Sequence, residues 1–368
     1  MKRTISPSLT FLLSMLIFAS GCKNDLPGAA PRGPKWVVYQ AGRVGISNGY
    51  ANCVFADAEG DVWFGTNHGA SYFNKNVWTN LYDSLTYSEF NNVNDSVYTG
   101  SVVTSITGGK DGSLWFGLAG GGVERYDKFS SAQTWIRYGV PDLPTNTVFS
   151  LAAELQELGE VWVGTNYGIG RFVPSDNPTF PLQGDWTTIT QETDGAHILD
   201  PNIGAMAHNP IDNSIWFSVG GLAVEYYDID NNQWGEMYGL PTNAQYEITS
   251  IAIDNTDHAW VGTYGGIDVL NINSGGWEHY YTYKDSATHG NLPNSPVNCV
   301  TTDYVSNRWF GTDQGLVDLN DTTWSLYTHE NSSLPNDTVH GVGYDRNGNL
   351  WIATSNGVAA YNPLGTSF

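Results

Sequence analysis

The fold is decided by the stretch DRNGNLWIAT, residues 345–354, which is one of seven copies of the same pattern. In each copy a turn region leads into a short apolar segment with Trp at its second position and a small residue two positions later. The seven cores are Val62–Thr66, Leu114–Leu118, Val161–Thr165, Ile215–Val219, Ala259–Thr263, Arg308–Thr312 and Leu350–Thr354. Their tryptophans lie 42 to 54 residues apart, a spacing typical of the blades of a β-propeller.

Each core is flanked by three further predicted strands. An apolar strand with a small third residue precedes it, as in Ile248–Ile251. A third strand follows, and Gly lies six residues after the core Trp in six copies, including Gly121 in the second copy, whereas the fourth copy has Leu222. The fourth strand begins with another Trp, and in the seventh copy only residues 36–39 at the other end of the propeller can supply it.

These observations predict an all-β protein, a seven-bladed β-propeller with four antiparallel strands per blade. A single four-stranded sheet cannot bury both of its faces, but a ring of sheets packs each face against a neighbour. The N-terminal strand is expected to complete the last blade, so that no open sheet edge remains. We expect the propeller to span residues 36–362 and a C-terminal tail to follow at 363–368.

The N-terminal region has the features of a bacterial secretory signal. Two basic residues precede a short apolar stretch, and residues 1–21 are predicted to be a signal peptide. The residues Ala19-Ser20-Gly21-Cys22 resemble the lipobox of bacterial lipoproteins, with Ala19 where Leu is more usual. This resemblance implies cleavage after Gly21, a lipid on Cys22, a flexible tether over residues 22–35 and a lipid-anchored location in the cell envelope, on the periplasmic or surface side of the outer membrane. An ordinary secretory signal is the alternative.

Composition excludes several classes of partner and site. The formal net charge is -22 and no basic run is present, which disfavours nucleic acid and leaves the lipid as the only expected membrane contact. The eight histidines are dispersed, so no metal is expected, and no cofactor motif is present. The run Asp228–Asn232 lacks the later residues of a calcium loop and is interpreted as a turn. Cys53 and Cys299 are interpreted as buried thiols rather than a disulfide.

The repeats resemble the two-component regulator propeller repeat family. The resemblance rests on the Gly/Asn turn, the Leu-Trp-Ile-Gly-Thr-like core and the linkers Leu292-Pro293-Asn294 and Leu334-Pro335-Asn336, and it covers nearly all of the predicted mature chain. Propellers of this family commonly form the extracytoplasmic sensor part of hybrid histidine kinases, and several recognise oligosaccharides. The sequence contains no kinase and no second propeller, so signalling by this chain itself is not expected.

Propellers usually bind ligands at the mouth of the central channel, where the loops between strands two and three lie, together with the linkers between blades. We expect these loops to recognise an oligosaccharide or an envelope protein, because amides, a carboxylate and aromatic rings suit a polyhydroxylated ligand. Ordinary polar turns are the simpler interpretation. The predicted ligand-binding residues are His68, Tyr167, Tyr264, Asp313, Gln314 and Asn356. The linkers add Arg43, Tyr50, Tyr87, Phe90 and His197.

Two other functions remain open. The first is a lyase acting on a polysaccharide or a cyclic peptide, which needs a His or Tyr base beside a charge-stabilising group. Arg43 and His68 are the nearest such pair in the sequence, and no catalytic residue is assigned. The second is a scaffold in an envelope or secretion complex, for which an apolar patch on the outer strands is expected.

Overall fold

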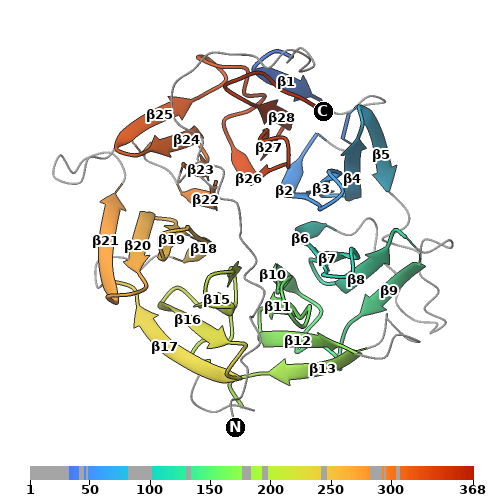
Figure 1. The fold of residues 1–368 in the computed structure, drawn as a ribbon, viewed down its shortest axis with the longest axis vertical. Coiled ribbons are helices and arrows are strands. Elements are labelled where there is room, and N and C mark those ends of the chain that lie inside the picture. Colours follow the sequence, from blue (N-terminus) through green and yellow to red (C-terminus); the bar gives the residue numbers. More distant parts are fainter. Residues whose placement is uncertain are drawn as a thin grey trace, which may run out of the picture. The chain divides into compact units, whose positions relative to one another are not determined.

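Figure 1 shows the computed structural model of the chain, whose described residues belong to the unit Gly33–Phe368. Within it, structure is described for residues 33–40, 45–46, 49–81, 102–129, 134–175, 184–192, 198–241, 247–281, 292–293, 296–303 and 307–368. The predicted signal peptide, Cys22 and most of the predicted tether lie outside these residues. In the described part of the chain all regular elements are strands, and no helix there meets the length and hydropathy needed to cross a membrane.

The described strands form seven sheets of four strands each, as predicted. Blade 1 contains β2 (Ala51–Ala56), β3 (Val62–Thr66), β4 (Gly69–Asn74) and β5 (Val77–Leu81). Blade 2 contains β6 (Val103–Gly108), β7 (Leu114–Leu118), β8 (Gly122–Asp127) and β9 (Thr134–Tyr138). Blade 3 contains β10 (Val148–Ala153), β11 (Val161–Thr165), β12 (Gly168–Pro174) and β13 (Gly184–Ile189). Blade 4 contains β14 (Met206–Asn209), β15 (Ser214–Val219), β16 (Ala223–Asp228) and β17 (Gln233–Gly239).

The remaining three blades complete the ring. Blade 5 contains β18 (Ile248–Ile253), β19 (His258–Thr263), β20 (Gly266–Asn271) and β21 (Gly276–Tyr281). Blade 6 contains β22 (Val297–Thr302), β23 (Arg308–Thr312), β24 (Gly315–Asn320) and β25 (Thr323–Tyr327). Blade 7 contains β26 (Val339–Tyr344), β27 (Leu350–Thr354), β28 (Gly357–Tyr361) and the N-terminal strand β1 (Trp36–Tyr39).

The N-terminal strand closes the ring. Strand β1 pairs antiparallel with β28, from Trp36 opposite Tyr361 to Tyr39 opposite Val358. The innermost strands of successive blades contact one another all the way round, including β26 with β2. Backbone hydrogen bonds between Gly33, Pro34 and Thr366 extend the pairing beyond the two strands. The predicted closure is therefore confirmed, and it joins the two ends of the described unit.

The core lies in the seams between blades. Trp63 of blade 1 is 1% exposed and its ring packs edge-on against Phe116 of blade 2, with centroids 5.8 Å apart. A Cβ added to Gly65 would lie 2.5 Å from Cys53 Sγ and 2.7 Å from Val103 Cγ1 of the next blade. A side chain larger than Gly is therefore excluded there, which explains the small residue two positions after the core Trp.

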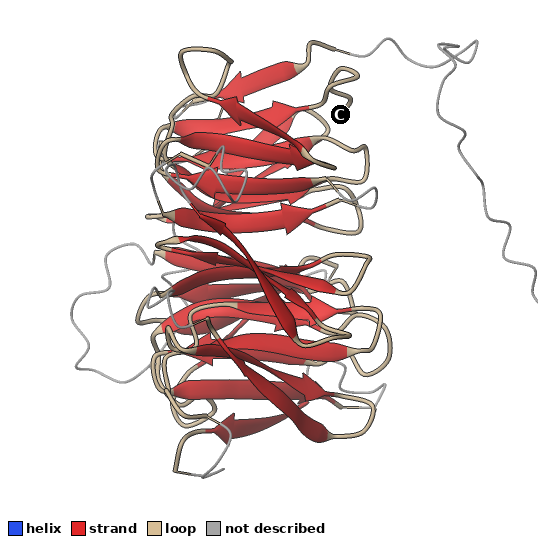
Figure 2. Cartoon of the chain, turned by 90° about the vertical axis from the view of Figure 1, so that its left-hand side faces the viewer, coloured by secondary structure: helices blue, strands red, loops and turns tan. Residues whose placement is uncertain are grey.

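The two faces of the ring carry different loops. Figure 2 shows the strands running across the thickness of the propeller, with loops gathered on both faces. We call the face with the loops between second and third strands the mouth face, and the opposite one, with the first-to-second and third-to-fourth turns, the hairpin face. In blade 2 the third strand begins at Gly122, which has a φ of 77°. The loop before it is one residue longer than in blade 1, so the glycine that opens the strand lies seven residues after Trp115 and not six.

Candidate binding site at the channel mouth

A threonine orders the mouth-face loop of five blades. In blade 1, Thr66 Oγ1 donates to the carbonyl of Gly69 at 2.8 Å and accepts the backbone N–H of His68 at 3.0 Å. The same pair of hydrogen bonds is made by Thr165, Thr263, Thr312 and Thr354. The threonine satisfies the loop backbone internally, which leaves the loop side chains available for other contacts.

The inner strands carry a β-bulge at their mouth-face end. Six of the seven described blades show the register shift, and blade 4 does not. A bulge leaves one residue of the strand without a paired residue on the neighbouring strand and changes the direction of its side chain. The bulged residues are Asn52, Thr104, Phe149, Thr249, Asn298 and His340.

Most of these bulged side chains connect neighbouring blades. Asn52 Nδ2 donates to the carbonyl of Val103 at 3.0 Å, and Thr104 Oγ1 donates to that of Val148 at 2.9 Å. Thr249 and Asn298 make the same contact to the blades that follow them. None of these residues was predicted from the sequence. Their signal was a polar residue at the second position of an otherwise apolar inner strand.

Blades 6, 7 and 1 bring five side chains together, which we call the mouth cluster: Tyr50, Asn298, Asp313, His340 and Ser355. Asn298 Nδ2 donates to Asp313 Oδ1 at 2.8 Å, and His340 Nε2 lies 2.8 Å from Ser355 Oγ. The ring of Tyr50 stacks on His340 with centroids 4.6 Å apart and an interplanar angle of 28°. The cluster therefore presents an aromatic face next to several hydrogen-bonding groups.

The protonation state of His340 follows from its surroundings. Burial lowers the pKa of His340, because the charged imidazolium is poorly solvated there, although the negative charge of Asp313 acts in the opposite direction. At neutral pH the imidazole is therefore uncharged. One ring nitrogen then donates a hydrogen bond and the other accepts one.

All six predicted ligand-binding residues lie on mouth-face loops and are exposed. Only Asp313 belongs to the mouth cluster, while Gln314 and Asn356 follow cluster residues on the same two loops. Tyr167 and Tyr264 lie on blades 3 and 5 and make no ring contact with each other. The Tyr167 hydroxyl instead lies 3.5 Å from Glu192, beyond the outer strand of its own blade. A propeller places one such loop on each blade, so equivalent positions are spread around the ring.

Several other predicted features can be placed. Tyr50, suggested from a linker, is part of the mouth cluster, whereas Arg43, Tyr87, Phe90 and His197 lie outside the described residues. Asp228–Asn232 forms the turn between β16 and β17, where the Asp228 carboxylate accepts two hydrogen bonds from Asn231. Cys53 and Cys299 are free thiols, and burial raises the pKa of each to about 12. The described part of the chain contains no cluster of three or more potential metal-ligating side chains.

Comparison with known proteins of similar sequence or structure supports this architecture. The family model described as "Two component regulator propeller" matches residues 45–68 and 333–356. Both segments run from a linker through an inner strand and a core strand to a mouth-face loop, and together they contain Tyr50, His340 and Ser355. A protein named histidine kinase P4, from Formosa agariphila, is 24% identical over an alignment of 288 positions that covers 63% of this chain and 20% of that protein.

Two solved structures show the same fold. The extracellular domain of BT4673 from B. thetaiotaomicron superposes with a TM-score of 0.66 at 20% identity, over 89% of this chain and 40% of that one. A catalytically inactive virginiamycin B lyase from Staphylococcus aureus, solved with quinupristin, superposes with a TM-score of 0.64 at 17% identity, over 88% and 98% of the two chains. The chain thus spans less than half of the kinase and of the extracellular domain that it resembles. It is a seven-bladed β-propeller, and two of its repeats, at residues 45–68 and 333–356, match the model of the two-component regulator propeller.

Proposed function

We propose that this propeller is an extracytoplasmic, lipid-anchored binding protein whose channel mouth recognises a neutral or weakly charged oligosaccharide. The observation that carries the proposal is the mouth cluster, in which the Tyr50 and His340 rings stack beside Asn298, Asp313 and Ser355. Aromatic faces pack against the C–H faces of sugar rings, and amide, carboxylate and hydroxyl groups satisfy sugar hydroxyls.

Charge supports a neutral or weakly charged ligand. The chain has a formal net charge of -22, and the described mouth cluster contains a carboxylate and a neutral histidine but no Lys or Arg. A strongly anionic glycan would be repelled by this field. The exposed loop residues His68, Gln314 and Asn356 are proposed to extend the same site, and Tyr167 and Tyr264 to contact more distant sugar units of a longer ligand.

The proposed location rests on the sequence together with the resemblance. The predicted signal peptide and lipidated Cys22 direct the chain out of the cytoplasm, and the similar BT4673 domain is described as extracellular. Replacement of Cys22 by Ser tests the anchor. We expect the variant to lose its membrane association or to remain uncleaved. Normal processing with continued membrane binding contradicts the lipid anchor.

A glycan array probed with the propeller, followed by calorimetry on the best ligand, tests the binding function. His340→Gln and Tyr264→Ala should each weaken binding by about 1 kcal/mol or more, as expected for a lost hydrogen bond or aromatic contact. His258→Gln and Phe129→Ala are the matched controls, because His258 begins β19 and Phe129 follows β8, both at the hairpin face. Unchanged affinity of the mouth variants places the site elsewhere, and an array without any bound glycan favours a protein partner in an envelope scaffold.

A lyase acting at the same mouth is the second candidate function. A neutral His340, hydrogen-bonded to Ser355 and stacked on Tyr50, has one unprotonated ring nitrogen, as a general base requires. The predicted alternative of Arg43 with His68 stays a prediction, because Arg43 lies outside the described residues. Formation of unsaturated sugar ends, followed by absorbance and lost in His340→Gln but not in His258→Gln, would support the lyase. Unaltered oligosaccharide after prolonged incubation removes it.

A further inference from the structure

The mouth face carries a second group of side chains over blades 3 and 4, away from the mouth cluster. Figure 1 shows β10 and β15 of these blades across the channel from β26 and β2, which carry or adjoin most of that cluster. We call the group the apolar patch: Phe149 at the bulge of β10, Tyr167, Leu199 and Leu222. Their exposed fractions are 37%, 47%, 52% and 62%. Four large apolar side chains therefore face solvent on one side of the mouth.

The segments that carry the patch are joined by hydrogen bonds to the linker between blades 3 and 4. The carbonyls of this linker accept three such bonds: Gly168 N to Pro201 O at 2.8 Å, Gly220 N to Asn202 O at 2.9 Å and Ser150 Oγ to Ile203 O at 3.2 Å. The linker, both mouth-face loops and the bulged end of β10 are thus adjacent. The patch is one connected surface, not a set of isolated side chains.

Blade 4 departs from the repeat at the point where it exposes Leu222. Its mouth-face loop is one residue longer than that of blade 1, and Val219 takes the place of the ordering threonine. The left-handed residue of the loop is Gly220, with a φ of 56°. The Leu222 N–H donates to the carbonyl of Val219, and its own carbonyl accepts the N–H of Leu240 at 2.8 Å. The backbone of Leu222 is therefore fixed, while packing within the blade does not account for its exposed side chain.

Carboxylates border the patch. The Tyr167 hydroxyl lies 3.5 Å from Glu192 Oε1, and a Cβ added to Gly220 would lie 2.5 Å from Asp200 Cγ. Glu247 is exposed in the linker from blade 4 to blade 5. None of these three carboxylates takes part in the ion pairs of the described residues. The described loops and linkers of the mouth face contain no Lys or Arg, so the charge around the patch is negative.

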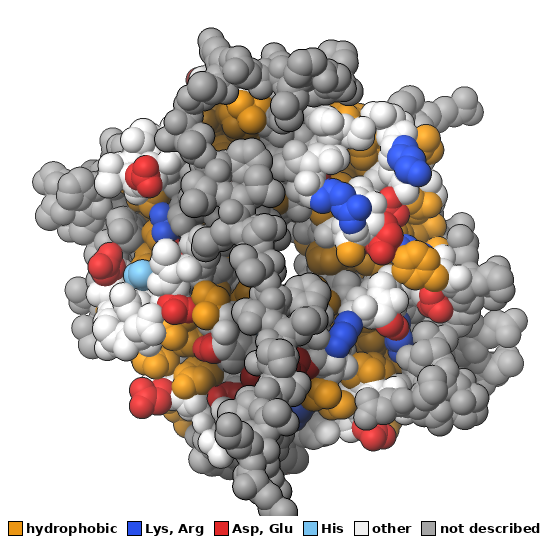
Figure 3. Space-filling view, viewed as in Figure 1, with side chains coloured by type: hydrophobic (Ala, Val, Ile, Leu, Met, Phe, Trp, Pro, Cys, Tyr) orange, Lys and Arg blue, Asp and Glu red, His pale blue; other side chains and the backbone are white. Residues whose placement is uncertain are grey.

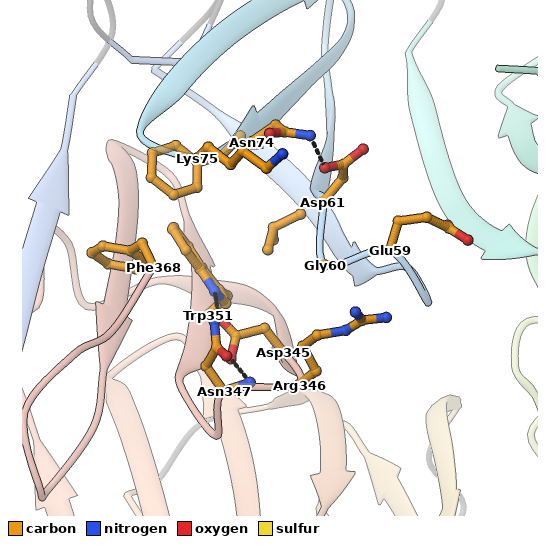
Figure 4. A pocket seen from close by; sticks show the side chains of 12 residues that line it. Glu59, Gly60, Asp61, Asn74, Lys75, Asp345, Arg346, Asn347, Trp351 and Phe368 are labelled. Carbon is orange, nitrogen blue, oxygen red and sulfur yellow. Dashed lines mark hydrogen bonds between the residues drawn. The ribbon is translucent and has the colours of Figure 1, made fainter. Parts of the chain in front are cut away.

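The exposed cations lie on the other face of the ring. Figure 3 shows the hairpin face, on which most of the Lys and Arg side chains lie in the right-hand half, over the blades of β2–β5 and β6–β9. Two of them, Lys75 and Arg346, are on turns of blades 1 and 7 (Figure 4). A cationic partner is therefore attracted to the mouth face and not to the hairpin face.

We propose that the apolar patch docks a segment of a partner protein in which apolar side chains alternate with Lys or Arg. The apolar side chains pack on Leu199, Leu222 and the two aromatic rings, and the cations meet the bordering carboxylates. The patch extends over two blades and the linker between them, which suits a length of chain. A second copy of this protein carries the same acidic border, so a symmetric contact through this patch is disfavoured.

The patch is separate from the mouth cluster, and its docking function does not depend on glycan binding. Tyr167 is common to the patch and to the distant end of the proposed glycan site, so the test uses the two leucines. The probe is a short peptide of alternating lysine and leucine. One matched peptide has glutamate in place of lysine, and another has serine in place of leucine.

Fluorescence anisotropy with the full chain measures the binding of the three peptides. We expect saturable binding of the lysine–leucine peptide, weakened by added salt, and at least fivefold weaker binding of the other two. Leu199→Ser and Leu222→Ser should each lower the affinity for the lysine–leucine peptide at least threefold. Leu155→Ser and Leu158→Ser are the matched controls, because these leucines are 51% and 50% exposed on a turn of the hairpin face. Thermal unfolding of each variant checks that the fold is retained.

Three results would overturn the proposal. Equal binding of the lysine–serine peptide would mean that only the net charge of the chain attracts the probe. An equal loss of affinity in the hairpin-face controls would place the contact elsewhere, and the absence of saturable binding up to about 1 mM would remove it. If no glycan binds while the peptide binds as described, only the glycan proposal is lost; the reverse result removes only the docking proposal.

Discussion

The seam between blades 5 and 6 and the seam between blades 6 and 7 use the same scaffold with opposite electrostatics. In the first seam, Arg308 lies over the Trp260 ring, 4.8 Å from its centroid, and pairs with Asp254 at 2.8 Å. Asp254 Oδ2 also accepts the Trp260 indole N–H at 2.9 Å. Here the buried carboxylate pairs with the cation and accepts a hydrogen bond from the indole, and the cation also packs over the indole ring.

The second seam has the carboxylates without the cation. Asp303 is the blade 6 equivalent of Asp254, but blade 7 carries Leu350 where blade 6 has Arg308. Asp318 of β24 lies opposite Trp309 in the ladder, and its buried Oδ1 has no hydrogen-bond partner. The comparison shows that the repeat fixes the positions of these groups, while single residues decide whether a seam is electrostatically balanced.

The pKa values of Asp254 and Asp318 differ in the direction that these contacts imply. Hydrogen bonds from Arg308, Thr256 and Trp260 outweigh desolvation and lower the pKa of Asp254 to about 2. Burial, assisted by the charge of Asp303, raises the pKa of Asp318 to about 6. A carboxylate in an unfolded chain has a pKa near 4. If folding lowers this pKa, the group stabilises the fold at pH values above 4; if folding raises it, the group stabilises the fold at pH values below 4.

The largest predicted effect is the removal of the cation from the balanced seam. Arg308→Met keeps most of the stem over Trp260 but leaves the Asp254 carboxylate buried without its charge partner. We expect a loss of about 3 kcal/mol in the free energy of unfolding at pH 7, within the range for broken buried pairs. Denaturant unfolding of the variant measures it, with Arg346→Met as a control for an exposed, unpaired arginine. Equal stability of the two variants would show that the seam does not depend on this pair.

The pH dependence of the unfolding free energy at acid pH tests the same ion pair. In the parent protein the contribution of Asp254 is present above about pH 4 and is lost as the pH falls toward 2. In Asp254→Asn this part of the pH dependence should disappear. Unfolding midpoints measured between pH 2 and 6 test the assignment, and a parallel pH profile for the parent and the variant contradicts it.

A smaller, opposite effect is predicted for the unbalanced seam. Asp318→Asn removes the carboxylate whose charged form is disfavoured, so we expect a gain of about 1 kcal/mol at pH 8, after allowance for its partial exposure to solvent. The gain should vanish below about pH 4, because Asp318 is then protonated in both the folded and the unfolded state. A loss of stability at pH 8 would mean that Asp318 has a favourable partner in this seam.

The smallest predicted effect on stability lies at the mouth. His340→Gln can retain a hydrogen bond to Ser355 and removes only the half-buried ring contact with Tyr50. We expect a change within about 1 kcal/mol in thermal or denaturant unfolding, well below that of Arg308→Met. A larger loss would identify the mouth cluster as a part of the stability core rather than as a binding surface.

Local pattern was sufficient to predict the fold. The tryptophans repeat at the interval of a blade, and every one of the seven second-strand and seven fourth-strand positions was assigned from the sequence. Blade 2 shows the limit of such counting, since its longer loop places the glycine that opens the third strand at Gly122, seven residues after the core Trp and not six. The six ligand-binding residues stay a prediction, and of the residues named from the sequence Asp313 and the linker residue Tyr50 belong to the mouth cluster.

What the sequence determined by itself is the number of blades, their strands and the closure by residues 36–39. The reason is that buried Trp, close-packed Gly and turn residues act within a few positions of one another along the chain. Only the tertiary structure decided which side chains meet at the mouth and in the seams. Those groups come from different blades, as Tyr50 and His340 do, so ring closure brings them together while their spacing in the chain carries no signal.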